Sequence, residues 1–397
     1  MDQALAMRVA NFMDSRLEDL KRKGVLAIAP DIYNPGRAYA KVVHFSPYAS
    51  DAALTDELRK RGIELQCYDP RPRHPLRALR DVVRIVRILR REHINIIRGR
   101  LPYAGSLIGC VAGGILGIPS VVSLGGDNRV AQELSGRFYF GSRMLSYGME
   151  ALVLRLCSRI IVPNRFTASY VARIIGQRAR DKCVVIPWMI EEVGPAGADD
   201  AGLRARFGIA EDAQLVPIIG FLNRYKFTDR LYDALDMIEL PRGPRPVFVF
   251  CGDGPLRADG ERRFAGRADV RFIGWQERAV VASLLRAAAF VLVPMSGFVL
   301  LEAASAGKPV VTSRVEWHSE LVADGKTGLL VDPEAPRQWA DAILRMLAEP
   351  ERAAEMARAL GARYREEYRP ERARALEIAL YQELAHQGDA HAEARAQ

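Results

Sequence analysis

The sequence predicts an α/β protein built from two successive doubly wound domains. Short β-branched runs recur in the first half of the chain, at 42–46, 63–68, 94–97, 120–124, 159–163 and 183–187. A second series occupies 215–222, 247–252, 270–275, 290–294, 309–313 and 328–331. Segments with 3.6-residue periodicity separate most of these runs, and such alternation indicates parallel sheets with helices on both faces. The 397 residues suit two domains, because single cores stop growing near ~250–300 residues.

The boundary between the domains is predicted from an acidic, glycine-containing segment. EEVGPAGADDAG (191–202) separates the two series of strands and is typical of a connection. We therefore expect an N-terminal domain over 1–192, a linker over 193–202 and a C-terminal domain over 203–368. The last segment, 369–397, is expected to form a helix that packs back toward the N-terminal domain and ends in a frayed tail.

The composition excludes several classes of protein. With 49% hydrophobic and 26% charged residues, the chain is neither fibrous nor disordered. The five cysteines are far apart and form no C-x-x-C pair, so we expect a reducing compartment and no cysteine zinc site. No stretch reaches the ~20 apolar residues that a bilayer crossing needs. Residues 1–24 mix acids with bases, which predicts a short amphipathic helix rather than a signal peptide, and a cytoplasmic protein.

The net charge of +9 is concentrated in one segment, where ten arginines and two acids lie between Arg71 and Arg100. Five of these arginines fall within a sector of ~80° on a predicted helix, and Leu79, Val82, Val83, Val86 and Leu89 lie on the other side. We call this set the arginine ridge: Arg77, Arg80, Arg84, Arg87 and Arg91. It is either a solvated face over the core or a surface for anionic lipid headgroups. Nucleic acid is a weaker alternative, because no aromatic interleaving and no recognisable module accompany the charge.

The most informative stretch is FVLVPMSGFVLLEAASAGKPVVTS (290–313). A strand is predicted to end at Pro294, and a helix is predicted from about Phe298 to Gly307. The free N–H groups at the start of that helix can bind a diphosphate. Glu302 lies one turn further in, where a carboxylate can accept two hydrogen bonds from a ribose diol. The alternative for Glu302 is an ordinary solvated helix acid.

Other short motifs do not match the binding or catalytic signatures that they resemble. G-K-T at 325–327 has Glu320 where a phosphate-binding P-loop has its first glycine. G-D-G-P-L-R at 252–257 has Arg257 where a dinucleotide fingerprint has its third glycine, although its two glycines permit close approach of a ligand to the backbone. The sequence contains no H-x-x-x-H zinc pair and no G-x-S-x-G hydrolase element.

Five blocks in a fixed order carry a resemblance to a known family. They are CGDGP (251–255), RFIGW (271–275), the AAAFVLVP strand, GFVLLEAASAGKPVV (297–311) and DGKTGLLVDP (324–333). From about Gly220 to Asp332 the chain resembles the nucleotide-sugar glycosyltransferases of family four. The resemblance implies the GT-B fold, two facing Rossmann-like domains with a cleft between them, in which the second domain binds the donor.

Residue by residue, the resemblance implies that Glu302 binds the ribose, that the G-D-G turn lies near the nucleotide, and that Gly274 and Trp275 lie beside the base. The expected donor site comprises Gly220, Gly252, Asp253, Gly254, Gly274, Trp275, Ser296, Gly297, Phe298, Val299 and Glu302. A basic pair, Arg224 and Lys226, is implied to neutralise the diphosphate, with ordinary surface cations as the alternative. The family's usual arginine directly after the glycine is Phe221 here.

The first domain contains the expected acceptor site. SLGGDN (123–128) has Gly125 where the family often has a histidine, but it retains Asp127, which we assign a catalytic role beside Arg224 and Lys226. The acceptor residues are expected to be Arg98, Arg100, Tyr103, Gly125, Gly126 and Asn128. Simple loop packing is the alternative for Tyr103 and the two arginines. A further departure is Pro294, which replaces a glutamate that family members commonly have eight positions before the one matched by Glu302.

The resemblance implies a retaining, metal-independent hexosyltransferase-type enzyme with a nucleoside-diphosphate sugar as its co-substrate and no other cofactor. The acceptor is expected to be a glycan or lipid-linked glycan in cell-surface polysaccharide or lipopolysaccharide biosynthesis. If the arginine ridge binds anionic lipid, the enzyme is expected to be a cytoplasmic protein held peripherally on the cytoplasmic face of the inner membrane; no nucleic-acid partner is expected. The alternatives are a degenerate GT-B scaffold, a GT-B sugar-nucleotide epimerase and a basic nucleic-acid-binding protein.

Overall fold

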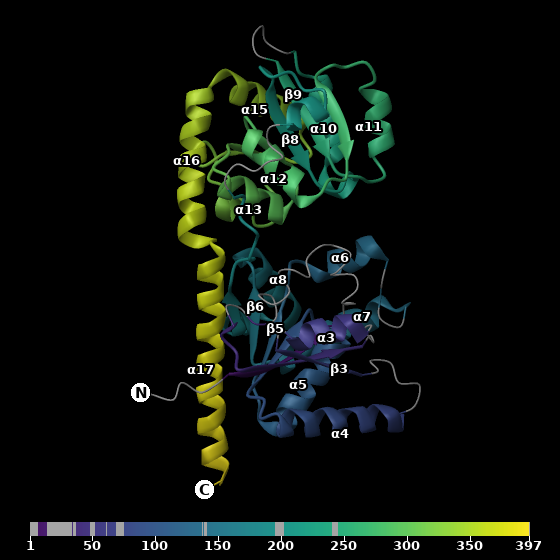
Figure 1. Ribbon diagram of the computed structural model, residues 1–397, viewed down its shortest axis with the longest axis vertical. Helices are drawn as coiled ribbons and strands as arrows, with labels where there is room; N and C mark the ends of the chain where they lie inside the picture. Colours follow the sequence, from purple (N-terminus) through teal and green to yellow (C-terminus); the bar gives the residue numbers. More distant parts are fainter. Residues whose placement is uncertain are drawn as a thin grey trace. The chain divides into compact units, whose positions relative to one another are not determined.

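The computed structural model contains two compact units, Met1–Pro187 with Ala373–Gln397, and Trp188–Arg372 (Figure 1). It describes residues 7–13, 34, 37–47, 52–60, 62–68, 75–136, 138, 141–194, 202–239 and 245–396. Each unit is built on one parallel sheet flanked by helices, so the predicted α/β class is confirmed. Most of the predicted linker, 195–201, lies outside the described residues. Of the helices that the structure describes, none is long and apolar enough to cross a membrane.

The first unit holds a seven-stranded sheet in the order β3-β2-β1-β4-β5-β6-β7. Its strands are β1 Arg8–Met13, β2 Lys41–Ser46, β3 Ile63–Cys67, β4 Ile96–Arg100, β5 Ser120–Ser123, β6 Arg159–Val162 and β7 Cys183–Val185. Its first helices are α3 Ala52–Lys60, α4 Pro75–Arg91, α5 Ala104–Leu116, α6 Asn128–Ser135, α7 Arg143–Leu156 and α8 Arg165–Ile175, followed by the 3-10 helix η3 Gln177–Lys182. All six predicted strands of this half are present.

One strand of this sheet contradicts the sequence prediction. We expected residues 1–24 to form an amphipathic helix, but Arg8–Met13 forms β1, between β2 and β4. Five of its six residues are buried, and the ring of Phe12 stacks on Phe45 of β2 at 4.6 Å. The charged residues that suggested a helix flank this short apolar run, and the rest of 1–24 lies outside the described residues.

The second unit holds a six-stranded sheet in the order β10-β9-β8-β11-β12-β13. The strands are β8 Gln214–Ile219, β9 Pro246–Cys251, β10 Val270–Gly274, β11 Val291–Val293, β12 Val310–Ser313 and β13 Leu329–Val331. The helical elements are α9 Leu203–Arg206, η5 Arg224–Lys226, α10 Thr228–Asp236, α11 Arg257–Arg263, α12 Arg278–Ala287, α13 Gly297–Ser305, α14 His318–Leu321, α15 Pro336–Ala348 and α16 Pro350–Glu367. The strand order reverses between β8 and β11, so the loops after these strands diverge at the carboxyl edge, where ligands bind in open α/β sheets.

The last helix, α17 (Pro370–Ala396), belongs to the first unit from Ala373 onward. Its Glu377 is 3% exposed and forms an ion pair of 3.0 Å with Arg98 of β4. The hydroxyl of Tyr39 also donates to Glu377, at 3.4 Å. The helix runs to Ala396.

The buried pair of Arg98 and Glu377 gives a first testable prediction. Glu377→Gln is expected to lower the free energy of unfolding by about 2 kcal/mol, because Arg98 keeps its charge and loses a charged partner. Urea unfolding measures the loss. The control is Glu383→Gln, since the exposed Glu383 lies 3.6 Å from Arg159. The control is expected to stay within about 0.5 kcal/mol of wild type, and equal losses in the two variants would contradict the assignment.

Candidate functional site

The carboxyl edge of the second sheet brings the start of α13 beside the loop that follows β8. The helix begins at Gly297, one residue before the predicted start. The hydroxyl of Ser296 caps it by accepting a hydrogen bond from the backbone N–H of Val299 at 3.4 Å. The other backbone N–H groups of this first turn have no acceptor within the helix, so they are able to donate hydrogen bonds to an anion.

Lys226 lies at the same place. Its Nζ donates to the carbonyl oxygen of Met295, in the turn that leads into α13, at 2.9 Å. The side chain of Asn223 fixes the η5 turn by accepting from the backbone N–H of Lys226 at 2.9 Å. Burial lowers the pKa of Lys226, and the nearby carboxylate of Glu316 opposes that shift. The other predicted cation, Arg224, is exposed on the same turn, so Lys226 is the one that the structure ties to α13.

Glu302 is 8% exposed, so it is not a solvated helix acid. Its Oε1 accepts a hydrogen bond from Nη1 of Arg278, the first residue of α12, at 2.5 Å. Arg278 also lies 3.7 Å from the carboxylate of Glu191. Burial raises the pKa of Glu302, and Arg278 lowers it. The sequence analysis missed Arg278, although it lies only three residues after Trp275 of the predicted base loop.

An aromatic cluster that the sequence analysis also missed packs on the start of α13. A Cβ atom on Gly297 would lie 2.6 Å from the indole of Trp188. The ring of Trp188 lies 5.5 Å from that of Phe298 and 5.4 Å from that of Trp317. Glycine is therefore required at position 297 because the indole occupies the space of a side chain.

The G-D-G turn packs closely against the loop after β8. The sequence predicts that its glycines let a ligand approach the backbone, and the structure adds that they also let these two loops approach each other. Gly252 has φ +153°, and its Cβ would lie 1.8 Å from the carbonyl oxygen of Gly220. Gly254 has φ +151°, and its Cβ would lie 2.4 Å from that of Leu222. The carboxylate of Asp253 accepts from the backbone N–H of Gly254 at 2.8 Å, which stabilises the turn.

The predicted base loop ends β10 at the same edge of the sheet. A Cβ on Gly274 would lie 2.9 Å from Arg257, and the side chain of Trp275 is 72% exposed. Two strands lie between β10 and β11, so their ends are roughly 15 Å apart at ~4.8 Å per strand. An extended nucleoside diphosphate can span such a distance. The predicted donor residues therefore share one edge, with the base loop at one end and α13 at the other.

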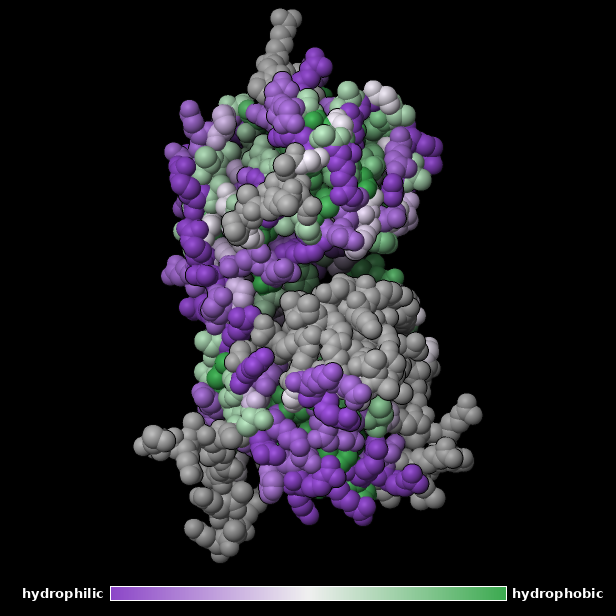
Figure 2. Space-filling view, viewed as in Figure 1, coloured by the Kyte–Doolittle hydropathy of each residue, from purple (hydrophilic) through white to green (hydrophobic). Residues whose placement is uncertain are grey.

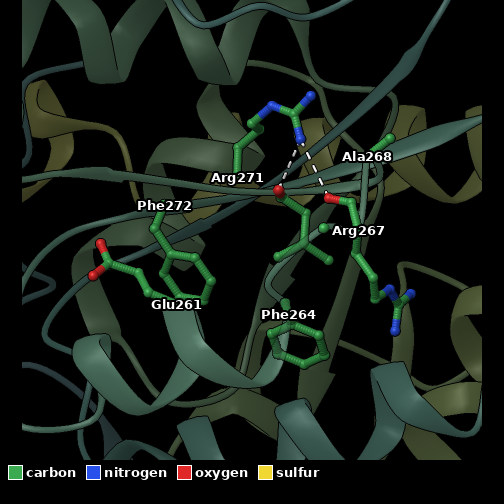
Figure 3. A pocket seen from close by; sticks show the side chains of 8 residues that line it. Glu261, Phe264, Arg267, Ala268, Arg271 and Phe272 are labelled. Atoms are coloured by element: carbon green, nitrogen blue, oxygen red, sulfur yellow. Dashed lines mark hydrogen bonds between the residues drawn. The ribbon is translucent and has the colours of Figure 1, made fainter.

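A separate pocket of about 420 Å³ lies beside β10 (Figure 3). Phe264 and Phe272 line it, and Arg271 donates to the carbonyl oxygens of Arg267 at 3.4 Å and Val270 at 2.9 Å. Because it adjoins the start of β10 rather than its carboxyl end, this pocket is not part of the predicted donor site.

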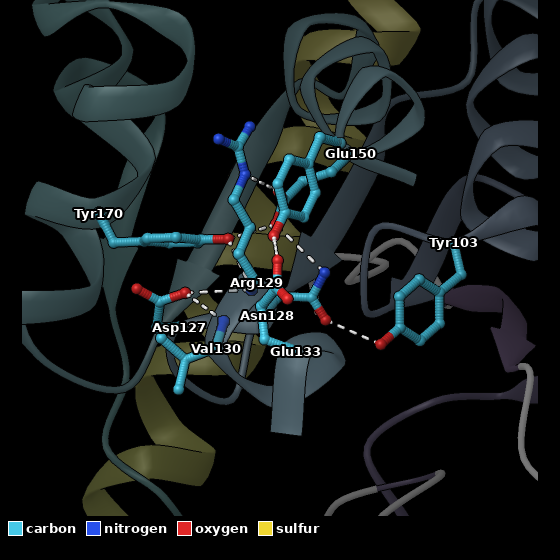
Figure 4. Close-up of polar contacts among 9 residues, drawn as sticks. Tyr103, Asp127, Asn128, Arg129, Val130, Glu133, Glu150 and Tyr170 are labelled. Carbon is cyan, nitrogen blue, oxygen red and sulfur yellow. Dashed lines mark hydrogen bonds and ion pairs between the residues drawn. The ribbon is translucent and has the colours of Figure 1, made fainter. Parts of the chain in front are cut away.

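In the first unit, the predicted loop after β5 leads into α6. The Oδ1 of Asp127 accepts from the backbone N–H groups of Arg129 and Val130, each at 3.0 Å (Figure 4). Asp127 is therefore the N-cap of α6. Its carboxylate, to which the sequence analysis assigned a catalytic role, stabilises the start of this helix.

Asn128 and Tyr103, both predicted to bind the acceptor, meet in a polar network around a fully buried acid (Figure 4). The hydroxyl of Tyr103 donates to Asn128 at 2.8 Å, and the Asn128 amide donates to Glu150 at 3.2 Å. Glu150 also accepts from Tyr170 at 2.6 Å and from Arg129 at 2.9 Å. The sequence signal for Glu150 is a lone acid in an otherwise apolar and basic helix, α7.

The other predicted acceptor residues lie apart from this network. Arg98 is 16% exposed and pairs with Glu377, whereas Arg100 is exposed at the end of β4. A Cβ on Gly125 would have no atom within 4 Å, so packing does not require glycine there. Gly126 has φ +152°, which favours glycine.

The arginine ridge lies on α4. Arg80, Arg84, Arg87 and Arg91 are exposed, whereas Ile85, Ile88 and Leu89 are buried. Arg77 belongs to α4, but its side chain lies outside the described residues. One prediction is wrong in detail: Val83, expected on the core side, is 38% exposed, because the buried stripe is centred on Ile85 and Leu89.

A buried histidine adjoins the donor edge. Nδ1 of His318 lies 2.8 Å from the hydroxyl of Thr312, which donates to the carbonyl oxygen of Val293 at 2.8 Å. Burial, together with the charge of Lys226, lowers the pKa of His318 to about 4. Burial also lowers the pKa of His44 in the first unit to about 4. Both imidazoles are therefore neutral in the folded protein.

This burial predicts a loss of stability in mild acid. Between about pH 6.5 and pH 4 the unfolded chain binds more protons than the folded one, so the free energy of unfolding falls as the pH falls through this range. His318→Gln is expected to remove part of that fall, and His44 retains the rest. Urea unfolding at pH 7.5, 6 and 5 measures the slope, and a slope identical to wild type would contradict a neutral His318.

Comparison with known proteins agrees with this architecture. Residues 41–192 match the family model described as Glycosyltransferase Family 4, and residues 199–363 match Glycosyl transferases group 1. A D-inositol 3-phosphate glycosyltransferase of Nocardiopsis dassonvillei is 30% identical over 68% of this chain and 66% of its own length. The alpha-D-kanosaminyltransferase of Streptomyces kanamyceticus and the D-inositol 3-phosphate glycosyltransferase of Gordonia bronchialis are aligned over only 40% and 37% of their own lengths.

Solved structures share the fold. Anabaena HepE in complex with UDP superposes with a TM-score of 0.72, at 19% identity, over 97% of this chain and all of its own. WaaG, a glycosyltransferase involved in lipopolysaccharide biosynthesis, gives a TM-score of 0.62 at 16% identity, over 93% of this chain and 99% of its own. With family models matched in both halves, the chain is a GT-B glycosyltransferase of the group 1 and family 4 type.

Proposed function

We propose that the protein transfers a sugar from a nucleoside-diphosphate sugar to a hydroxyl group of a glycan or lipid-linked glycan, with retention of configuration and without a metal ion. The observation that carries this proposal is the arrangement at the start of α13. Three kinds of group lie within the first two turns of that helix or against them: unpaired helix N–H groups, the ammonium of Lys226 and the buried carboxylate of Glu302. A diphosphate and a ribose need this set of groups.

In the proposed reaction, the bond between the sugar C1 and the diphosphate oxygen breaks, and a bond from C1 to the acceptor oxygen forms. The electron pair of the broken bond leaves with the diphosphate, and the acceptor hydroxyl gives its proton to the departing diphosphate oxygen. Negative charge therefore grows on the diphosphate in the transition state. The α13 N–H groups and Lys226 are positioned to stabilise that charge, and they do not have to reorganise during the reaction.

The arginine ridge supports a lipid-linked acceptor. Arg80, Arg84, Arg87 and Arg91 are all exposed on one helix, and each basic residue near an anionic bilayer contributes about 1 kcal/mol. WaaG, which shares the fold, is involved in lipopolysaccharide biosynthesis, and that role supports a membrane-bound glycan as acceptor. We accordingly place the reaction at the cytoplasmic face of the inner membrane.

The test is release of nucleoside diphosphate from UDP-, GDP-, ADP- and dTDP-sugars, with and without a bacterial glycolipid extract. Release from one donor that requires the extract and persists in EDTA supports the proposal. An anomeric configuration that matches the donor, read by NMR, supports retention. Conversion of the sugar nucleotide without acceptor would instead show an epimerase, and nucleotide binding without turnover would show the degenerate scaffold that Pro294 and Gly125 make conceivable.

A further inference from the structure

Three adjacent helices cover one face of the first sheet. α5 packs against α4 on one side and against α7 on the other. Their inner side chains, among them Ile88 of α4, Ala112 of α5 and Val153 of α7, are buried in the core of the unit. The outer surface of these helices therefore faces solvent, and its composition can be read directly from the exposed residues.

That outer surface is apolar on α5 and α7. Leu145, Leu152 and Leu156 fall within a sector of ~40° at ~100° per residue. Their side chains are 48%, 44% and 49% exposed, and Val111 and Ile115 of α5 are 42% and 61% exposed. We call these five residues the apolar face. Because α5 packs against α7, these exposed aliphatic side chains lie on two neighbouring helices, and such clustering is typical of a surface that binds a partner or a membrane.

The exposed charge on the same helices is mainly positive. α5 has no charged residue, and α7 exposes Arg143 and Arg155 while its only acid, Glu150, is fully buried. α4 adds the arginine ridge, with Asp81 as its only acid. Figure 2 shows hydrophilic side chains gathered over the end of the first unit where α4 lies, with apolar atoms among them. The described surface of these three helices is therefore apolar and cationic.

We propose that the apolar face inserts into the headgroup region of an anionic bilayer while the arginine ridge contacts the lipid phosphates. The inference rests on the proposed lipid-linked acceptor, and it names the surface that holds the enzyme at the membrane. Transfer of the leucine side chains from water into the bilayer is favourable, and the negative surface potential of the bilayer attracts the arginines beside the apolar face. A second copy of the chain is a poorer occupant, because it would bring two cationic surfaces together.

Insertion is measured with an environment-sensitive fluorophore on an introduced cysteine. Leu152→Cys is labelled in a Cys67→Ser background, since Cys67 is the exposed one of the five free cysteines. The control site is Met237→Cys on the second unit, whose native side chain is 48% exposed. With phosphatidylcholine vesicles that contain phosphatidylglycerol, the emission is expected to shift to the blue at position 152 and to stay unchanged at position 237.

Affinity gives the second readout. Leu152→Ser with Leu156→Ser is expected to weaken vesicle binding about tenfold, because two half-exposed leucines no longer enter the bilayer. Met237→Ser is the matched control and is expected to bind like wild type. In solution, the double variant keeps its affinity for the donor nucleotide, since that site lies in the second unit.

Three outcomes overturn the inference. Vesicle binding without a shift at position 152 would show that the arginines act alone. A dimer that persists at high salt in sedimentation experiments, and that dissociates in the Leu152→Ser variant, would show that a second copy of the chain covers the apolar face. Equal vesicle binding by the double variant and wild type would show that the leucines do not insert. Failure of donor binding in solution is a separate result, which would overturn the proposed function and leave the membrane surface intact.

Discussion

Replacing Lys226 by methionine is expected to lower kcat/KM for the sugar donor about 10²–10³-fold. The ammonium group lies at the turn before α13, 2.9 Å from the carbonyl oxygen of Met295, where the leaving diphosphate is expected. Methionine keeps most of the side-chain volume and removes the positive charge. The loss is therefore expected mainly in kcat, because the charge that Lys226 stabilises grows toward the transition state.

Lys308→Met is the matched control for this variant. Lys308 is also partly buried, and burial lowers the pKa of its ammonium group. It precedes β12 and lies beside Pro309 in a pocket at the opposite edge of the sheet. Its loss is expected to change kcat/KM less than about twofold, since no diphosphate contacts it. Equal losses in the two variants would show a general effect of buried lysines on stability rather than catalysis at α13.

Glu302→Gln is expected to weaken binding of the donor nucleotide about 100-fold. The carboxylate can accept two charge-assisted hydrogen bonds from a ribose diol, each about 1.5 kcal/mol stronger than that of a neutral amide. Isothermal titration measures the affinity. Glutamine retains the shape of the side chain, although Arg278 loses its charged partner.

The control for Glu302→Gln is Glu355→Gln on the exposed face of α16. It removes the same charge from the same unit and is expected to leave the affinity unchanged. Thermal unfolding of both variants without nucleotide checks that each is folded. A folded Glu302→Gln protein with wild-type affinity would show that this carboxylate serves only the ion pair with Arg278.

The strands were predictable because their signal is local. Each β-branched run lies between turn residues, and each predicted run from 42–46 to 328–331 contains a strand of the structure. The start of α13 was predictable for the same reason, since Pro294, Ser296 and Gly297 mark a strand end and a helix start within four residues. β1 was missed because its six residues lie among charged neighbours that favour a surface helix.

The partners of the site residues were not predictable, because they come from distant parts of the chain. Arg278 reaches Glu302 only after β10, α12 and α13 have packed together. The indole of Trp188 covers Gly297 in the same way. Arg98 forms an ion pair with Glu377 of α17, and no pattern in the sequence of β4 indicates that contact. Sequence patterns thus located the donor edge, and tertiary packing decided which side chains fix its geometry.

The central claim is that the start of α13 binds the donor diphosphate. Hydrogen exchange of the backbone amides of Gly297 and Phe298, with and without a nucleoside diphosphate, tests it most directly. We expect exchange at these amides to slow when the nucleotide that binds in titration is added, and exchange at α4 to stay unchanged, because a bound anion would accept hydrogen bonds from N–H groups that have no acceptor within the helix. Bound nucleotide with unchanged exchange at these two amides would contradict the account.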